Sequence, residues 1–144
     1  MEIKMDINNI LSDGEKVTPR EYSPLALAFM GDAVYESFIR AKVLIEANAS
    51  ANTLHKRAVH YVNCNAQADA INAFSDKLTE EEEAVYKRGR NAKTFTVPKN
   101  ADVSVYHSAT GFEALIGWLY LMGRTERACE IMEFSYNYIK NQEH

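Results

Sequence analysis

Two long stretches of this 144-residue chain are almost free of charge, and each contains a single acid. Residues 24–35 carry only Asp32, and residues 103–123 carry only Glu113. A helix that is apolar nearly all round is buried in a folded domain. We therefore expect two central helices, in which each carboxylate must be paired, neutralised or bound to a cation, because an unpaired buried charge is costly.

Capping residues and breakers divide the rest of the sequence into further helices. Ser23 followed by Pro24 is a typical helix start, Thr79 with Glu82 forms a capping box, and Asp102 is expected to cap the helix that follows it. The acidic run around Glu82 is then expected to be a solvated helix start rather than a metal site. No stretch alternates with a period of two, so we expect an all-α domain of five or six helices. The expected spans are residues 5–11, 24–47, 53–74, 79–89, 103–123 and 125–140.

Composition and length agree with one globular domain. Hydrophobic residues make up 47% of the chain and charged residues 25%, which excludes disordered and collagen-like classes. We expect a single domain over residues 1–144, with its core at about 22–141. No stretch is long and apolar enough for a membrane span, and the first residues do not read as a leader. A cytoplasmic protein is therefore expected.

The two cysteines, Cys64 and Cys129, are isolated and fit no metal-binding or disulfide pattern. Buried, reduced thiols are the expected outcome. Catalysis by Cys64 beside His55 or His60 is the less favoured alternative.

Each of the two isolated acids has a glycine close by. Gly31 precedes Asp32, and Gly117 lies one turn beyond Glu113. Glycine within a helix costs about 1 kcal/mol relative to alanine, so each glycine is expected to permit close approach of another backbone. If the two helices cross there, the carboxylates meet and could hold a hard cation such as Mg²⁺. Alternatively, each acid is a buried hydrogen-bonding residue or faces solvent at a helix end.

Positive charge is concentrated in one segment. Between residues 84 and 101 there are five basic residues and no acid, which leaves a net charge of −9 on the rest of the chain. Such a segment neutralises RNA phosphates, although a solvated basic loop is the alternative. We expect a loop over residues 90–101, and the candidate RNA contacts are Lys87, Arg88, Arg90, Asn91, Lys93 and Lys99.

Three stretches resemble one known family in order and spacing. LALAFMGDAVYE (25–36) resembles the signature helix of the ribonuclease III catalytic domain, and TGFEALIGWLYL (110–121) resembles its second carboxylate helix. YKRGRNAKTFTVPKN (86–100) is similar to the basic segment of the small branch, the Mini-ribonucleases III, which lack a double-stranded RNA-binding domain.

The resemblance implies an all-helical homodimer that cuts double-stranded RNA with Mg²⁺ and leaves 5′-phosphate and 3′-hydroxyl ends. Asp32 and Glu113 correspond to catalytic metal ligands. The implied role is trimming of precursor 23S ribosomal RNA, with help from a ribosomal protein on the substrate left open. Full-length members carry acids where this chain has Leu25, Ala28 and Thr110, so the number of metals per site is also left open.

Several other residues are expected to lie at the surface, in the core or at a dimer contact without binding metal. Glu36 is expected to be solvated or to face a dimer partner rather than to bind metal. Lys56, Arg57 and His60 are expected to be solvent-exposed. The core and part of the dimer contact are expected from apolar residues that include Phe29, Phe112, Ile116, Trp118 and Leu119.

Two other functions fit the same sequence. One is a catalytically weak factor that binds double-stranded RNA on the same fold, which the missing acids at positions 25, 28 and 110 would favour. The other is a helical protein-interaction module that does not bind RNA.

Overall fold

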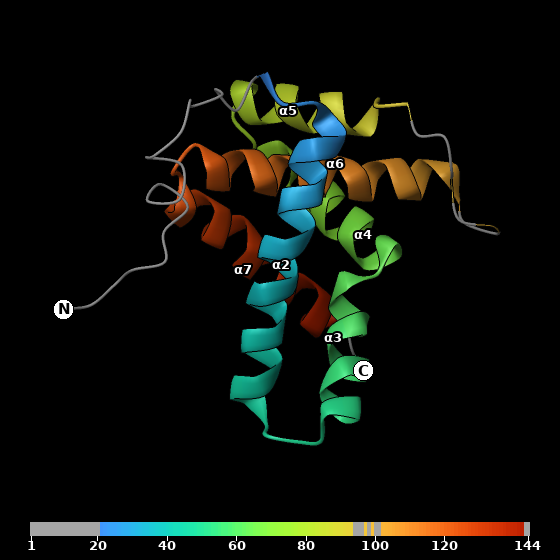
Figure 1. The fold of residues 1–144 in the computed structure, drawn as a ribbon, viewed down its shortest axis with the longest axis vertical. Coiled ribbons are helices and arrows are strands. Elements are labelled where there is room, and N and C mark those ends of the chain that lie inside the picture. The colour runs from blue at the N-terminus through green and yellow to red at the C-terminus, as the bar shows by residue number, and fades with distance from the viewer. Residues whose placement is uncertain (1–20, 94–96, 98, 100–101, 143–144) are drawn as a thin grey trace.

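Helices account for nearly all of the chain that the structure describes. This computed structural model describes residues 21–93, 97, 99 and 102–142 (Figure 1). Among these residues there is no strand, which confirms the predicted all-α class. The helix expected at residues 5–11 lies outside the described residues. The helices are α2 (Pro24–Glu46), α3 (Ala51–Val62), α4 (Cys64–Phe74), α5 (Glu80–Arg90), α6 (Val103–Leu121) and α7 (Thr125–Asn141), with a short 3₁₀ turn at Ser75–Lys77.

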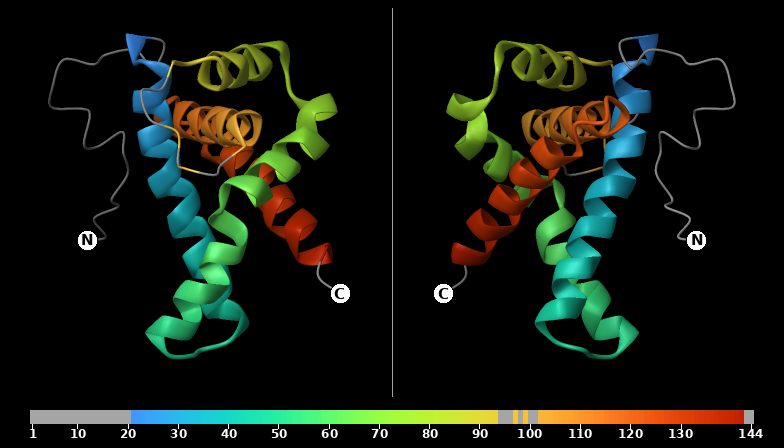
Figure 2. Two further views of the ribbon diagram at one scale, coloured as in Figure 1. Left: turned by 90° about the vertical axis from the view of Figure 1, so that its right-hand side faces the viewer. Right: turned by 90° about the vertical axis from the view of Figure 1, so that its left-hand side faces the viewer.

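Helix α6 lies at the centre of the bundle. Helices α2, α4, α5 and α7 all pack against it, and both side views in Figure 2 show α5 above α6 and α2 at its side. Its apolar side chains form the middle of the core, as the uncharged sequence predicted. The fully buried residues of α6 include Phe112, Leu115, Ile116, Trp118 and Leu119.

Helix α2 differs from its prediction, because only one side of it is buried. Tyr35 and Ile39 lie in the core, but Phe29 is 81% exposed and Ile45 is 82% exposed. The helix lies against the side of α6 rather than inside the bundle (Figure 2). The near absence of charge from residues 24–35 of α2 therefore does not reflect complete burial within this chain.

The predicted caps are present. The Ser23 hydroxyl accepts a hydrogen bond from the Ala26 amide at 3.1 Å, and the capping box between Thr79 and Glu82 is formed. Asp102 accepts from the Ser104 amide at 2.9 Å and begins α6. After α6 ends, Gly123 adopts a φ of 77°, a conformation that favours glycine and terminates helices.

The helix predicted over residues 53–74 is divided in two at Asn63. Its side chain donates to the carbonyl oxygens of Val59 and His60, both at 3.0 Å, and accepts from the Ala66 amide at 2.9 Å. One asparagine therefore closes α3 and caps α4, and the single-helix prediction was wrong. Ala58 and Tyr61 of α3 are buried in the core.

The acidic start of α5 is only partly solvated. Glu82 is 4% exposed and binds Arg127 of α7 through two hydrogen bonds of 2.8 and 2.9 Å. Burial by itself would raise the pKa of Glu82, but hydrogen bonds from Arg127 and Thr79 hold it below its usual range. The expectation that this run is a solvated helix start was therefore wrong for Glu82, which ties α5 to α7.

Helices α2 and α6 cross with their backbones in contact, at the two glycines that the sequence singled out. A Cβ atom on Gly31 would lie 1.7 Å from the carbonyl oxygen of Glu113. A Cβ atom on Gly117 would lie 2.0 Å from the carbonyl oxygen of Leu27. No other residue type fits at either position, so the predicted crossing at the glycines is confirmed.

Gly31→Ala should destabilise the fold, since the new methyl group forces two backbones apart. We expect a loss of about 3 kcal/mol in the free energy of unfolding, at the upper end of overpacking effects, measured by urea denaturation. Ser37→Ala, at an exposed position of the same helix, is the control and should be neutral or slightly stabilising. Equal stability of the two variants would contradict the described crossing.

Candidate active site

The glycine crossing brings Asp32 and Glu113 together. Asp32 follows Gly31 on α2, and Glu113 contributes the carbonyl oxygen that lies against Gly31. The two carboxyl groups share a hydrogen bond. Asp32 is exposed and Glu113 is half-buried, so the pair opens to solvent on the Asp32 side. The expectation of a fully buried Asp32 was wrong, because α2 presents this side outward.

The carboxyl pair holds a proton in the absence of a cation. Burial, the hydrogen bond from Asp32, and the negative charges of Asp32 and Glu36 raise the pKa of Glu113 from its ordinary 4.5 to about 9. Like charges in contact cannot both ionise without a compensating positive charge. A divalent cation supplies that charge, so the donor set fits Mg²⁺ on electrostatic grounds.

Few other ligand atoms surround the pair. Within the described part of the chain, no group of three or more His, Cys, Asp or Glu side chains is arranged to hold a metal. Leu25 and Ala28 offer no ligand atoms, and the Thr110 hydroxyl donates to the Tyr106 carbonyl at 3.0 Å. Two carboxylates supplemented by water and substrate phosphate form a usual Mg²⁺ environment. The residues present therefore fit a magnesium ion with several non-protein ligands.

Glu36 and Cys64 are close enough to Glu113 to interact with it electrostatically. Glu36 accepts two hydrogen bonds from the exposed Arg40, at 2.9 and 3.1 Å, so its carboxylate has its own cation. Cys64 and Cys129 are both exposed, and the prediction of buried thiols was wrong. Partial desolvation and the charge of Glu113 raise the pKa of the Cys64 thiol. A raised thiol pKa disfavours the reactive thiolate and so argues against cysteine catalysis.

The basic segment begins on a helix rather than in a loop. Lys87, Arg88 and Arg90 belong to the last turns of α5, and the predicted helix end near Gly89 is confirmed within one residue. Lys87 pairs with Glu83 at 2.8 Å, and the Arg90 guanidinium lies 5.7 Å from the centre of the Tyr86 ring. The cations at 87–90 are therefore held on a rigid element.

The candidate RNA contacts divide between two hollows. Arg90, Asn91 and Lys93 line one of about 680 Å³, together with His107 of α6. Arg88 lines a different hollow of about 450 Å³, together with Glu80, Glu81 and Trp118. Positions 88 and 90 are separated by about 200° around a helix, which explains the division. Lys99 is exposed, and nothing places it in either hollow.

His107 is a residue that the sequence analysis did not select. It lies six residues before Glu113 on α6, on the wall of the Arg90 hollow. His107 lies four residues after Val103, which lines the same hollow. Residues four apart lie on the same face of a helix, so this spacing could have indicated from the sequence where His107 points.

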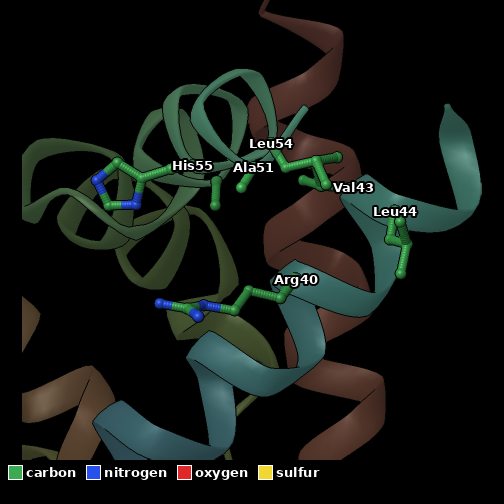
Figure 3. Close-up of a pocket in the computed structure, with 7 residues that line it drawn as sticks. Arg40, Val43, Leu44, Ala51, Leu54 and His55 are labelled. Atoms are coloured by element: carbon green, nitrogen blue, oxygen red, sulfur yellow. The ribbon is translucent and has the colours of Figure 1, made fainter. Parts of the chain in front are cut away.

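A third hollow, between α2 and α3, is unrelated to the carboxyl pair (Figure 3). It has a volume of about 230 Å³ and is mostly apolar, with the polar side chains of Arg40 and His55 at its edge. None of the predicted site residues lines it. On α3 itself, Lys56, Arg57 and His60 are exposed as predicted.

None of the helices in the described part of the chain is long and apolar enough to span a bilayer.

Comparison with known proteins identifies the family. Residues 25–124 match the family described as the Ribonuclease III domain. The Mini-ribonuclease 3 of Thermoanaerobacter sp. (strain X514) is 49% identical over 118 residues, which are 82% of this chain and 83% of that protein. The Mini-ribonuclease 3 of Symbiobacterium thermophilum is 43% identical, over 85% of this chain and 94% of that protein.

A solved structure is similar as well. The crystal structure of a protein from Fusobacterium nucleatum has a TM-score of 0.76 and 34% sequence identity, and it covers 85% of this chain and 98% of its own. These matches extend across both carboxylate helices and the basic segment between them. The chain therefore belongs to the ribonuclease III family, in its Mini-ribonuclease 3 branch, and is an endoribonuclease.

Proposed function

We propose that this endoribonuclease cleaves double-stranded RNA with Mg²⁺ held by Asp32 and Glu113. The observation that carries the proposal is the hydrogen-bonded carboxyl pair at the glycine crossing, in a chain of this family. The proposed substrate is double-stranded RNA at the ends of precursor 23S ribosomal RNA. Such a substrate would place the enzyme in the cytoplasm. Residues 1–144 would form a single catalytic domain. A ribosomal protein bound to the substrate is a candidate helper.

The chemistry assigns a distinct task to each carboxylate. When bound, Mg²⁺ supplies an activated water and compensates charge at the scissile phosphate, which would leave 5′-phosphate and 3′-hydroxyl ends. Exposed Asp32 would contact the ion from the substrate side, and half-buried Glu113 would fix it against α6. Loss of the shared proton accompanies ion binding, because both groups must then be ionised.

RNA binding is assigned to the basic segment that lies between Asp32 and Glu113 along the chain. Duplex RNA presents phosphates and 2′-hydroxyls across a shallow minor groove, so cations on a fixed element give salt-dependent, largely sequence-independent affinity. Arg90, Asn91 and Lys93 share one hollow and are the leading contacts. Lys99 is a further contact, whereas Lys87 and Arg88 have acidic neighbours and contribute less.

A homodimer is proposed from the exposed side of α2. Phe29 is 81% exposed and lies one turn before Asp32, with the 40% exposed Leu25 one turn earlier. Large exposed apolar side chains of this kind mark interaction surfaces. A second copy that covers this side would place two active sites close together, one for each strand of a duplex.

Asp32→Asn should reduce cleavage of duplex RNA in Mg²⁺ by at least about a hundredfold, because a neutral amide binds the cation poorly. The measurement is a gel-resolved digestion, run beside an EDTA control. Binding of the duplex in Ca²⁺ should survive the substitution. Full cleavage by the variant would refute the assignment of Asp32, and binding without cleavage by the wild type would favour the catalytically weak binding factor.

Arg90→Ala combined with Lys93→Ala should weaken duplex binding and reduce the slope of log Kd against log salt concentration by about two, since two phosphate contacts are lost. Arg88→Ala is the matched control and should change that slope less, because Arg88 lines the other hollow. Binding titrations at several salt concentrations provide the slopes. An unchanged slope in the double variant would exclude this segment as the RNA contact.

Phe29→Lys should convert a dimer to a monomer, because a charge replaces the apolar centre of the proposed contact. Sedimentation velocity at micromolar concentration measures the outcome. Ile45→Lys is the control, as Ile45 is equally exposed (82%) at the other end of the same helix. Identical sedimentation of both variants would place any dimer contact elsewhere.

A further inference from the structure

We propose that His107 is a specificity-determining residue that contacts the ribose 2′-hydroxyl of the bound RNA strand. The inference rests on the proposed binding of duplex RNA and extends it to a residue of α6. His107 and the last residues of α5 come from different helices but line the same hollow of about 680 Å³. The hollow therefore combines an imidazole with two cations, Arg90 and Lys93, and the amide of Asn91.

The ring of His107 has an unmet hydrogen-bonding group. Its Nδ1 atom is buried and has no hydrogen-bond partner in the described structure. Buried polar atoms are bonded in the large majority of cases, so an exception requires an explanation. Trp118 and Gln67 also have unpartnered atoms, but both side chains are almost completely buried, at 0% and 3% exposed. The His107 side chain as a whole is half-buried and lines the cationic hollow, so a ligand there reaches the accessible part of the ring rather than the buried Nδ1 atom.

The lining of the hollow matches one nucleotide unit of an RNA backbone. Arg90 and Lys93 suit successive phosphates, and the apolar side chains of Ala92, Val97 and Val103 suit the carbon atoms of a sugar. Between two phosphates of a strand lies one ribose, whose free hydroxyl is the 2′-hydroxyl. An imidazole nitrogen can accept from or donate to a hydroxyl. The shallow minor groove of an RNA duplex displays 2′-hydroxyls and base edges, and of these the 2′-hydroxyl lies on the backbone between the two phosphates.

The test combines protein variants with modified RNA. His107→Phe keeps a ring of similar size and removes both nitrogens, whereas His107→Gln places an amide near the position of Nε2. Affinity is measured in Ca²⁺, without cleavage, for an all-ribose duplex and for a series in which one 2′-deoxyribose moves along the strand. His55→Phe, on α3 outside this hollow, is the control for loss of a histidine.

For the wild type, we expect one 2′-deoxy position to weaken binding about tenfold, the value of one lost hydrogen bond to a polar ligand group. The His107→Phe variant should bind the all-ribose duplex about tenfold more weakly than the wild type does. The 2′-deoxy substitution at that position should not weaken the binding of this variant any further. His107→Gln should recover part of both effects, and His55→Phe should behave as the wild type.

The following outcomes would each overturn the inference for a different reason. If wild type and His107→Phe lose the same affinity at every 2′-deoxy position, His107 does not read the ribose. If a base substitution, but no deoxy substitution, removes the difference between the two proteins, the contact is to a base edge. If the wild type neither binds nor cleaves any duplex, the proposed function itself fails, whatever the behaviour of His107.

Discussion

The backbone contact between α2 and α6 at Gly31 and Gly117 determines the geometry on which the rest of the site depends. Because neither residue has a Cβ atom, the carbonyl oxygens of Glu113 and Leu27 occupy space that any other residue would fill. The same contact seats the central helix in the core and joins the Asp32 and Glu113 carboxyl groups. Stability and the candidate chemistry therefore share one interaction, so that neither glycine can change without affecting both.

The charged groups of this fold differ in how completely they are paired with one another. The carboxyl pair is kept together against its own repulsion by the packing of α6 and by a shared proton. The Glu82–Arg127 pair satisfies a buried carboxylate completely, with the Thr79 amide as a further donor. Arg90 and Lys93, by contrast, line a hollow whose described lining contains no acid. The buried ion pair is thus satisfied within the fold, whereas the charges that act on Glu113 are those of other acids and the described lining of the hollow offers these two cations no carboxylate.

Local features were predictable from the sequence, and tertiary ones were not. The caps at Ser23, Asp102 and Thr79 depend on neighbouring residues, so the helix starts that they define were predicted correctly. The crossing at the glycines followed from their cost within a helix. The burial of Glu82 depends on Arg127, 45 residues away, and no local pattern indicates it. The separation of Arg88 from Arg90 follows from helical rotation, but only once the end of α5 is known.

Helix α5 is fixed to neighbouring helices near both of its ends. Its start is fixed to α7 through Glu82, and near its end Gly89 lies against α6, where a Cβ atom would approach Gly111 within 2.9 Å. Arg90 follows directly on this anchored backbone. A cation whose backbone is already ordered loses less conformational entropy on binding than one on a free chain. Any phosphate contact made by Arg90 would therefore retain more of its electrostatic energy as affinity than the same contact made from a free chain.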